Sequence, residues 1–396
     1  MKVLQLCLKV PYPPSDGGCI AMYHMQKSWW ANGVEVKVLT FNTIKHPVQL
    51  DKLPSDYLSK TKMEGVFLDN RIKPMAALIA LLKGESYNMK RFITSEFDNK
   101  LESVLKNNNF DVVQLESLFM APYIETIRKT SKAKIVFRPH NVEYKIWERL
   151  AKNTFHPFKK IYIKILAKQL KKYESSILNK VDVLTPLTWD DAQELMKLKC
   201  RKPMMVLPIG VDCNDYKQQS PPNNQVVFHL GAMDWMPNVE GVQWFIQKVW
   251  PIIISKNKNA SLKLAGKGMP AAILELKNEK ISVESWVDHA QNFYKEGQVM
   301  IVPLLSGSGM RVKIMEGMAM GKAIVTTSIG LEGIMANHKE QVLVGDRPED
   351  FADHVLYLLD NEEEVKKLGC AARKMVEEKY NLEFLGQNWL DFIRNN

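Results

Sequence analysis

The sequence predicts an α/β protein built from two doubly wound, Rossmann-like domains. Its 396 residues exceed what a single hydrophobic core usually organises. Short apolar segments alternate with helical segments along the chain, which is typical of parallel sheets. The polar segment Pro221–Gln225 interrupts this alternation, and a second series of strands follows it.

The first half begins with the apolar run Val3–Val10, which we expect to be a strand. A helix is expected over 20–32, because Gly33 follows it as a C-terminal glycine. The next strand is expected at Val34–Phe41. Further strand-like runs are Asp111–Leu115, Lys134–Arg138, Val181–Leu184 and Met204–Pro208.

The second half repeats the pattern. The expected strands are Val226–Leu230, Ser261–Ala265, Ile281–Glu284, Val299–Leu305, Ala323–Thr327 and Gln341–Val344. We therefore expect an N-terminal domain over 1–207, a linker over 208–224 and a C-terminal domain over 225–380. A last helix, over 381–396, has no strand after it and is a candidate to pack back on the N-terminal domain.

The composition excludes some classes of protein. Hydrophobic residues make up 46% and charged residues 25%, which argues against disorder. The net charge of +10 would attract nucleic acid, anionic lipid or phosphate-bearing substrates alike. The five scattered cysteines form no CxxC pair, which favours a reducing compartment. No run approaches the about 18 apolar residues of a spanning helix, so we expect a cytoplasmic protein.

The most informative segment is 299–327, in which a buried strand leads through a glycine-rich loop into a helix. Glycines such as Gly309 let the backbone approach a phosphate, and a helix N-terminus offers free N–H groups. Arg311 and Lys313 add positive charge in the first turns, and Glu316 could accept hydrogen bonds from ribose hydroxyls. The pattern favours a nucleoside diphosphate site, and a plain turn with solvated charges is the alternative.

Several motifs together resemble glycosyltransferase family four, in its bacterial polysaccharide-type branch. They are the segment 299–327, VFHLGAMDWMPNVEGVQWF, LKLAGKG, VESWVDH, SIGLEGI, RPHNVEYKIWERLA and the early Gly17-Gly18 loop. Their order and spacing cover nearly the whole chain. The resemblance implies the GT-B architecture, in which two Rossmann-like domains face each other across an interdomain cleft. Ligands of such sheets bind beyond the carboxyl ends of the strands.

The resemblance implies roles for the residues of the glycine-rich segment. Glu316 matches the family's carboxylate that holds the nucleotide ribose, and we count it among the catalytic residues. Arg311 and Lys313 would neutralise the diphosphate beside Gly309. Ser308 stands where the family has a second glutamate, so the contact with the donor sugar departs from the usual pattern there.

Other matched positions also belong to the implied donor site. Gly231 lies in the loop where relatives carry an arginine and a lysine, and Lys267 is the candidate substitute, unless it is a solvated lysine. Trp286 and Val287 fall where such enzymes meet the nucleobase, and a packed core tryptophan is the alternative at the first of these.

Two motifs of the first half complete the implied site. His140 ends the strand-like run KIVFRPH and matches the family's catalytic histidine, which faces the donor sugar. A structural histidine is the alternative. Gly17 and Gly18 match the loop that closes over the donor phosphates, and a tight turn is the alternative.

The implied function is transfer of a hexosyl-type sugar from a nucleotide-diphosphate sugar to a glycan or lipid-linked acceptor, with retained configuration. No Asp-x-Asp motif is present, so we expect neither a metal nor a cofactor besides the substrate. Two other classes of protein are alternatives. One is a nucleotide-sugar epimerase of the same fold, and the other is a nucleic-acid-binding protein, for which only the charge speaks. We expect no nucleic-acid partner.

Two segments raise the possibility of a membrane contact. Phe155–Glu174 is a basic, amphipathic helical segment, and Pro74–Gly84 is apolar. Such helices bind peripherally to anionic bilayers. Ordinary helices packed on the first sheet are the alternative. The membrane interpretation predicts a location at the inner face of the membrane and an acceptor in surface polysaccharide or glycolipid synthesis.

Overall fold

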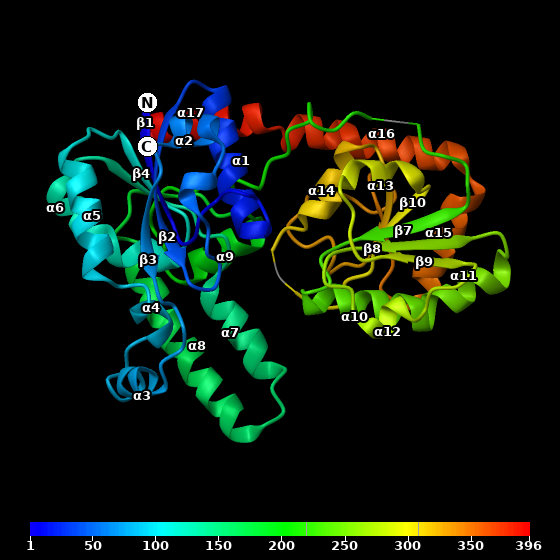
Figure 1. The fold of residues 1–396 in the computed structure, drawn as a ribbon, viewed down its shortest axis with the longest axis horizontal. Helices are drawn as coiled ribbons and strands as arrows, with labels where there is room; N and C mark the ends of the chain where they lie inside the picture. Colours follow the sequence, from blue (N-terminus) through cyan, green and yellow to red (C-terminus); the bar gives the residue numbers. More distant parts are fainter. Residues whose placement is uncertain (219, 308) are drawn as a thin grey trace. The chain divides into compact units, whose positions relative to one another are not determined.

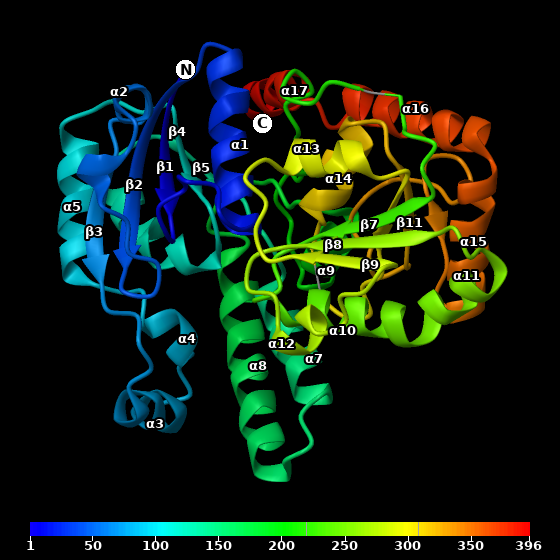
Figure 2. The same cartoon turned by 45° about the vertical axis from the view of Figure 1, so that its right-hand side comes forward.

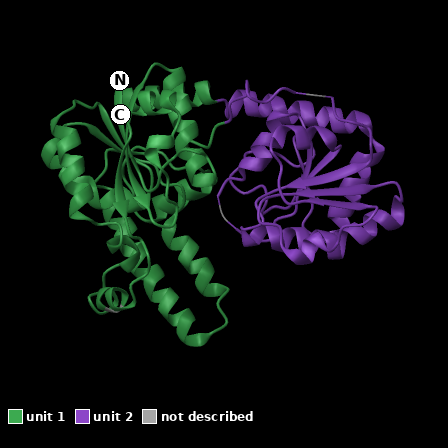
Figure 3. Ribbon diagram, in the orientation of Figure 1, with its two compact units in different colours: residues 1–210, 382–396 green, residues 211–381 purple. Residues whose placement is uncertain are grey.

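The computed structural model describes residues 1–218, 220–307 and 309–396. The chain divides into two compact α/β units, which are coloured separately in Figure 3. Unit 1 comprises Met1–Gly210 together with Leu382–Asn396, and unit 2 comprises Val211–Asn381. The end of the chain therefore belongs to the same unit as its beginning.

Unit 1 is built on a six-stranded parallel sheet in the order β3-β2-β1-β4-β5-β6. Its strands are β1 (Lys2–Cys7), β2 (Glu35–Thr43), β3 (Glu64–Leu68), β4 (Val112–Leu115), β5 (Lys134–Phe137) and β6 (Val183–Leu184). The chain proceeds outward from β1 in one direction and then from β4 in the other. The carboxyl ends of β1 and β4 are therefore the topological switch point, where doubly wound sheets bind ligands.

Helices cover both faces of this sheet (Figures 1 and 2). They are α1 (Gly17–Ala31), η1 (Leu50–Lys52), α2 (Ser55–Thr61), α3 (Pro74–Leu82), α4 (Tyr87–Lys90), α5 (Ser95–Lys106), η2 (Leu118–Tyr123), α6 (Ile124–Thr130), α7 (Glu143–Lys152), α8 (Pro157–Ile177), α9 (Trp189–Lys197) and α17 (Leu382–Asn395). Strand β1 shows why both faces are covered. Leu4 and Leu6 pack into one core, and Val3 and Cys7 pack into the other.

The last helix, α17, packs on the first helix, α1. Trp389 of α17 is fully buried, and its ring meets that of Trp29 edge-on with centroids 5.1 Å apart. The Ser28 hydroxyl donates to the Leu382 carbonyl at 2.6 Å. This helix therefore contributes to the core of unit 1.

Unit 2 has a second six-stranded parallel sheet, in the order β12-β11-β10-β7-β8-β9. Its strands are β7 (Val226–Leu230), β8 (Ser261–Ala265), β9 (Ile281–Glu284), β10 (Val299–Val302), β11 (Ala323–Thr326) and β12 (Leu343–Val344). Here the switch point lies between β7 and β10. The fold class predicted from the sequence, two doubly wound Rossmann-like domains, is confirmed.

Seven α-helices and a π-helical turn flank the described part of this sheet. They are α10 (Met236–Trp244), η3 (Phe245–Val249), α11 (Trp250–Lys256), α12 (Ala271–Leu274), α13 (Ala290–Glu296), α14 (Val312–Ala319), α15 (Pro348–Asp360) and α16 (Glu362–Lys379). Among the residues that the structure describes, no helix is both long and apolar enough to cross a bilayer.

The structure corrects two details of the expected strands. Met204–Pro208 is not a strand, because only an isolated bridge joins Met204 to Leu184. Strand β3 was not predicted. It is an edge strand with exposed positions, so its sequence EGVFL lacks a continuous apolar run. The first unit boundary falls after Gly210, inside the expected linker, and the cleft between the domains stays a prediction.

Candidate functional site

In unit 2, the loops that follow β7 and β8 are in direct contact. The backbone N–H of Met233 donates to the Lys267 carbonyl at 2.7 Å. A Cβ atom at Gly266 would lie 1.8 Å from the Gly231 carbonyl oxygen, and Gly266 has a φ of +155°. Glycine is therefore required for these two loops to touch. Lys267 itself is exposed.

Gly231 lies directly beneath the amino group of Lys313. A Cβ atom at Gly231 would lie 2.3 Å from Lys313 Nζ and 2.9 Å from His229 Nε2. Lys313 donates to Asn238 Oδ1 at 2.8 Å, and burial, with the charge of Arg311, lowers the pKa of Lys313 to about 7. The structure thus confines an amine above the buried peptide backbone of Gly231 at the switch point.

His229 is the second buried group beneath this amine. Its Nδ1 lies 2.9 Å from the Ile301 carbonyl, so Nδ1 carries the proton. Burial, with the charge of Lys313, lowers the pKa of His229 to about 3. The imidazole is therefore neutral near pH 7. Sequence reasoning missed it, although a histidine as the next-to-last residue of an apolar strand is a visible signal.

Arg311 occupies the N-cap of α14, one residue before the helix begins. Its side chain is only 5% exposed, and its Cζ lies 5.4 Å from the centroid of the Trp235 ring. Nη1 donates to the Gly309 carbonyl at 2.8 Å, and Glu332 lies 4.0 Å from Nη2. Arg311 is thus folded against the glycine-rich loop and Trp235, and it precedes the first helical turn, in which the sequence predicted it.

Glu316 lies further along α14, on the same helix as Lys313. Its Oε1 accepts a hydrogen bond from the Tyr216 hydroxyl at 2.9 Å, and burial raises its pKa. One carboxylate oxygen is therefore already engaged by a protein donor. Sequence analysis missed Tyr216, because it falls in the segment that was expected to be a linker.

The other predicted donor residues are placed differently. Ser308 lies outside the described residues, and Gly309 adopts a φ of +80°, which favours glycine. Trp286 follows β9, the edge strand, and is 63% exposed, with Nε1 donating to Asp288 Oδ1 at 2.9 Å. A packed core tryptophan is therefore excluded. Val287 beside it is partly buried.

In unit 1, His140 is joined to a buried carboxylate that sequence reasoning missed. His140 Nε2 lies 2.8 Å from Oε2 of Glu116, which directly follows β4 at the switch point. Glu116 is fully buried and also accepts from Gln5, Gln114 and Arg138, at 2.7, 2.6 and 3.2 Å. Because a carboxylate can only accept, Nε2 of His140 carries the proton.

This network fixes the state of Glu116. Burial alone would raise its pKa, but the charge of Arg138 and the hydrogen bond from His140 hold the pKa at about 2. Glu116 is therefore an anion that orients the His140 ring through Nε2. The signal in the sequence was a glutamate immediately after an apolar run, in the segment DVVQLES.

Gly17 and Gly18 form the first turn of α1, but an internal anion already caps this turn. The Asp16 side chain accepts from the N–H groups of Gly18 and Cys19 at 2.9 and 3.1 Å. Lys9 forms an ion pair with the same carboxylate. Asp16 therefore holds the N–H groups of Gly18 and Cys19, and the assignment of the Gly17-Gly18 loop to the donor phosphates stays a prediction.

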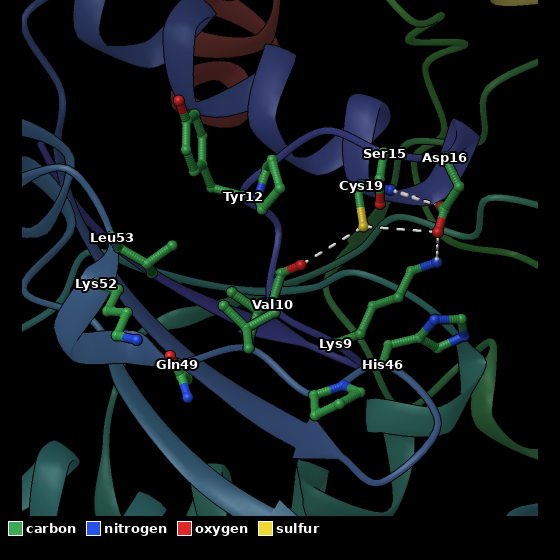
Figure 4. A pocket seen from close by; sticks show the side chains of 13 residues that line it. Lys9, Val10, Tyr12, Ser15, Asp16, Cys19, His46, Gln49, Lys52 and Leu53 are labelled. Carbon is green, nitrogen blue, oxygen red and sulfur yellow. Dashed lines mark hydrogen bonds and ion pairs between the residues drawn. The ribbon is translucent and has the colours of Figure 1, made fainter. Parts of the chain in front are cut away.

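A pocket of about 550 Å³ opens beside this capped turn, beyond the ends of β1 and β2 (Figure 4). The side chains of Lys9, His46 and Lys52 line it, together with Asp16 and Tyr12. Lys9 and Asp16 pair with each other within this lining.

Comparisons with known proteins agree with this architecture. Residues 224–361 match the family model described as Glycosyl transferases group 1. The sucrose-phosphate synthase of Thermosynechococcus elongatus superposes with a TM-score of 0.71, at 13% identity, over 100% of this chain and 99% of the other. HepE of Anabaena, solved with UDP and glucose, superposes with a TM-score of 0.66, at 12% identity, over 100% of both chains.

The fold is therefore that of the GT-B glycosyltransferases, and the match to the group 1 glycosyl transferase model lies within unit 2. One relative is similar in sequence over nearly the whole chain. An uncharacterised 44.6 kDa protein from the cps region of Klebsiella pneumoniae is 23% identical over 394 residues, which cover 96% of each chain.

Proposed function

We propose that this protein transfers a sugar from a nucleotide-diphosphate sugar to a glycan or lipid-linked acceptor during the synthesis of a surface polysaccharide or glycolipid. The observation that carries the proposal is the amine of Lys313, held over the glycine backbone at the switch point of the group 1 domain. Two relatives support it. HepE was solved with UDP and glucose, and the Klebsiella protein is encoded in a cps region.

In this proposal, Lys313 and Arg311 neutralise the diphosphate. The leaving nucleoside diphosphate gains negative charge as the glycosidic bond breaks, and fixed cations stabilise that charge. The partly buried amine of Lys313 is suited to this task, because its proton is bound more tightly once an anion is present. No metal is required for this neutralisation, so the proposed reaction is metal-independent.

Glu316 is proposed to hold the ribose, with its carboxylate accepting hydrogen bonds from the hydroxyls. Tyr216 already donates to one oxygen and fixes the orientation of the carboxylate. Trp286 and Val287 are proposed to meet the nucleobase, which the exposed indole ring is free to stack against. Gly231 and Gly309 are proposed to let the backbone approach the phosphates, and Lys267 is proposed to add positive charge.

His140 is proposed to contact the donor sugar, positioned by Glu116. Retention of the anomeric configuration is part of the proposal. A location at the inner face of the membrane would give the enzyme access to a lipid-linked acceptor.

The direct test is a thermal-shift panel of nucleoside diphosphates and nucleotide sugars. A ligand present at about 100 times its dissociation constant stabilises the folded state by about 2.7 kcal/mol. We expect a uridine, guanosine or adenosine diphosphate to raise the melting temperature, and Glu316→Ala to abolish the rise.

The matched control is Glu279→Ala, which removes an exposed glutamate of the same unit. This variant should respond to ligand like the parent. An unchanged response of Glu316→Ala would disprove the ribose assignment. Conversion of a nucleotide sugar to its epimer without an acceptor would disprove the transferase proposal.

A further inference from the structure

We propose that one surface of unit 1, formed by α8, α3 and a lysine-lined groove beside α8, docks on an anionic lipid bilayer. The proposal rests on exposed side chains of unit 1 and does not depend on the donor site. We call this surface the docking surface. It comprises the exposed side chains of α3, the α7–α8 loop, the outer stripe of α8 and the lysines of the groove.

Helix α8 carries a continuous exposed stripe at helical spacing. Phe158, Ile161 and Ile165 form its first half, and Lys168 and Lys172 form its second half. Steps of three and four residues place all five on one side of a helix. Phe158 is 77% exposed, so a large aromatic side chain faces solvent at the apolar end of this stripe.

The opposite side of α8 already supplies what the fold requires. Ile163, Leu166, Leu170 and Ile177 are buried, and α7 packs along α8 as its hairpin partner. Figures 1 and 2 show the two helices extending away from the sheet as a pair. The apolar half of the outer stripe is therefore not needed for folding, and its exposure calls for another explanation.

A second apolar element lies at the same end of unit 1. Helix α3 contains no charged residue, and its exposed side chains include Met75, Ile79 and Leu82, the last 80% exposed. Phe155, in the loop that joins α7 to α8, is fully exposed. Both views show α3 and the α7–α8 loop extending from the same end of the sheet (Figures 1 and 2). Short helix α4 contacts both α3 and α8.

A cationic groove of about 590 Å³ lies beside α8 and the end of α9. Gly84, just after α3, and Ile165 of α8 both line it, so the groove adjoins both. Five lysines also line it, and none of its lining residues is acidic. These lysines are Lys168, Lys171, Lys172, Lys197 and Lys199. Lys197 pairs with Glu194 at 2.6 Å, and Lys171 lies 4.5 Å from the centroid of the Tyr144 ring.

The combination of charges and apolar groups selects a bilayer as the occupant. From Pro157 to Tyr173, α8 carries six lysines and no acidic residue. An anionic bilayer offers phosphate headgroups for the lysines and, a few ångströms deeper, hydrocarbon for Phe158 and Leu82. A nucleic acid or acidic protein would pair with the lysines but would leave the exposed apolar side chains in water. The groove is therefore assigned to lipid headgroups.

The test is flotation of the full chain with vesicles of phosphatidylcholine, alone or mixed with phosphatidylglycerol. We expect binding to the mixed vesicles and little binding to phosphatidylcholine alone. Each lysine near an anionic surface contributes roughly a fivefold factor, so Lys168→Gln/Lys172→Gln should weaken binding roughly twenty- to thirtyfold. Phe155→Ser/Phe158→Ser should weaken it at every lipid composition.

The matched control is Lys277→Gln/Lys280→Gln, which removes the same charge from exposed positions of unit 2. It should bind vesicles like the parent. If the control variant and the groove variant lost vesicle binding equally, the loss would follow from net charge alone, and the assignment would be overturned. The assignment would also be overturned if the parent bound no vesicles but bound single-stranded DNA, and if the groove variant and the phenylalanine variant bound that DNA as well as the parent does. Each variant is also tested for a thermal shift with nucleoside diphosphate. A shift equal to that of the parent shows an unchanged donor site, so a loss of vesicle binding then belongs to the docking surface.

Discussion

Lys313 is the residue whose chemistry depends most on its surroundings. Its amine lies over the Gly231 backbone with Asn238 as a neutral acceptor, and burial lowers its pKa to about 7. In a flexible chain a lysine holds its proton to about pH 10.4. The folded protein therefore binds fewer protons than the unfolded chain between these values, and its stability should rise with pH across that window.

Binding of a diphosphate reverses this preference, because the anion favours the protonated amine. Above about pH 7 the free protein must take up a proton to bind, so the affinity should fall by up to roughly tenfold per pH unit. Calorimetric titration between about pH 6 and pH 9 measures this slope and the proton uptake. Lys313→Met should bind weakly at every pH, without the slope, and should be at least as stable as the parent when unliganded. A slope that persists in this variant would assign the titration to another group.

Glu116 acts on His140 through a single contact of 2.8 Å. Glu116→Gln removes the anion but keeps the shape, so the ring should lose its fixed orientation. We expect kcat to fall roughly ten- to a hundredfold, with KM for the donor little changed and the pH profile shifted. Because Arg138 is left buried without its charged partner, stability should fall by about 3 kcal/mol.

A double-mutant cycle separates positioning from simple destabilisation. If Glu116 works through His140, then Glu116→Gln should cost no further activity in a His140→Ala background. Additive losses of activity would show that Glu116 supports the reaction independently of the histidine.

At the scale of elements, α17 is the clearest case of long-range packing. It ends the chain but packs on α1, near its beginning, through the buried pair Trp29 and Trp389. Large-to-small substitution of a fully buried aromatic side chain typically costs about 3–5 kcal/mol. Trp389→Ala should therefore destabilise unit 1 by an amount in this range, as measured by urea unfolding.

The control for this prediction is Tyr357→Ala, which truncates an exposed aromatic side chain of unit 2. Its unfolding midpoint should stay close to that of the parent. Near-parental stability of Trp389→Ala would mean that α17 is not part of the cooperative unit.

The strands show which elements can be predicted from the sequence. Strands β4, β10 and β11 are buried at every position, and their sequences, VVQL, VMIV and AIVT, are mostly apolar. Edge strand β3 alternates between buried and exposed positions over five residues, and it went unrecognised. A short amphipathic strand carries too few apolar residues to stand out, because only its pairing with β2 defines it.

At the scale of the whole molecule, two sheets of the same doubly wound topology each place a switch point at the carboxyl ends of their central strands. In unit 1 this point carries Glu116, and His140 follows the neighbouring strand. In unit 2 it carries Gly231 and the start of α14. The residues that sequence reasoning selected in these loops therefore lie where such sheets bind ligands. Trp286 follows the edge strand of its sheet instead.

The sequence by itself determined the α/β class, the two series of strands and the glycine-rich turn that leads into α14. These are local properties, because apolar runs, caps and glycines act over a few neighbouring residues. Only the tertiary structure decided the partners of the charged groups: Glu116 for His140, Tyr216 for Glu316, and Trp235 beneath Arg311. Most of these partners come from distant segments, and burial, which sets the charge of Lys313, exists only once the chain has folded.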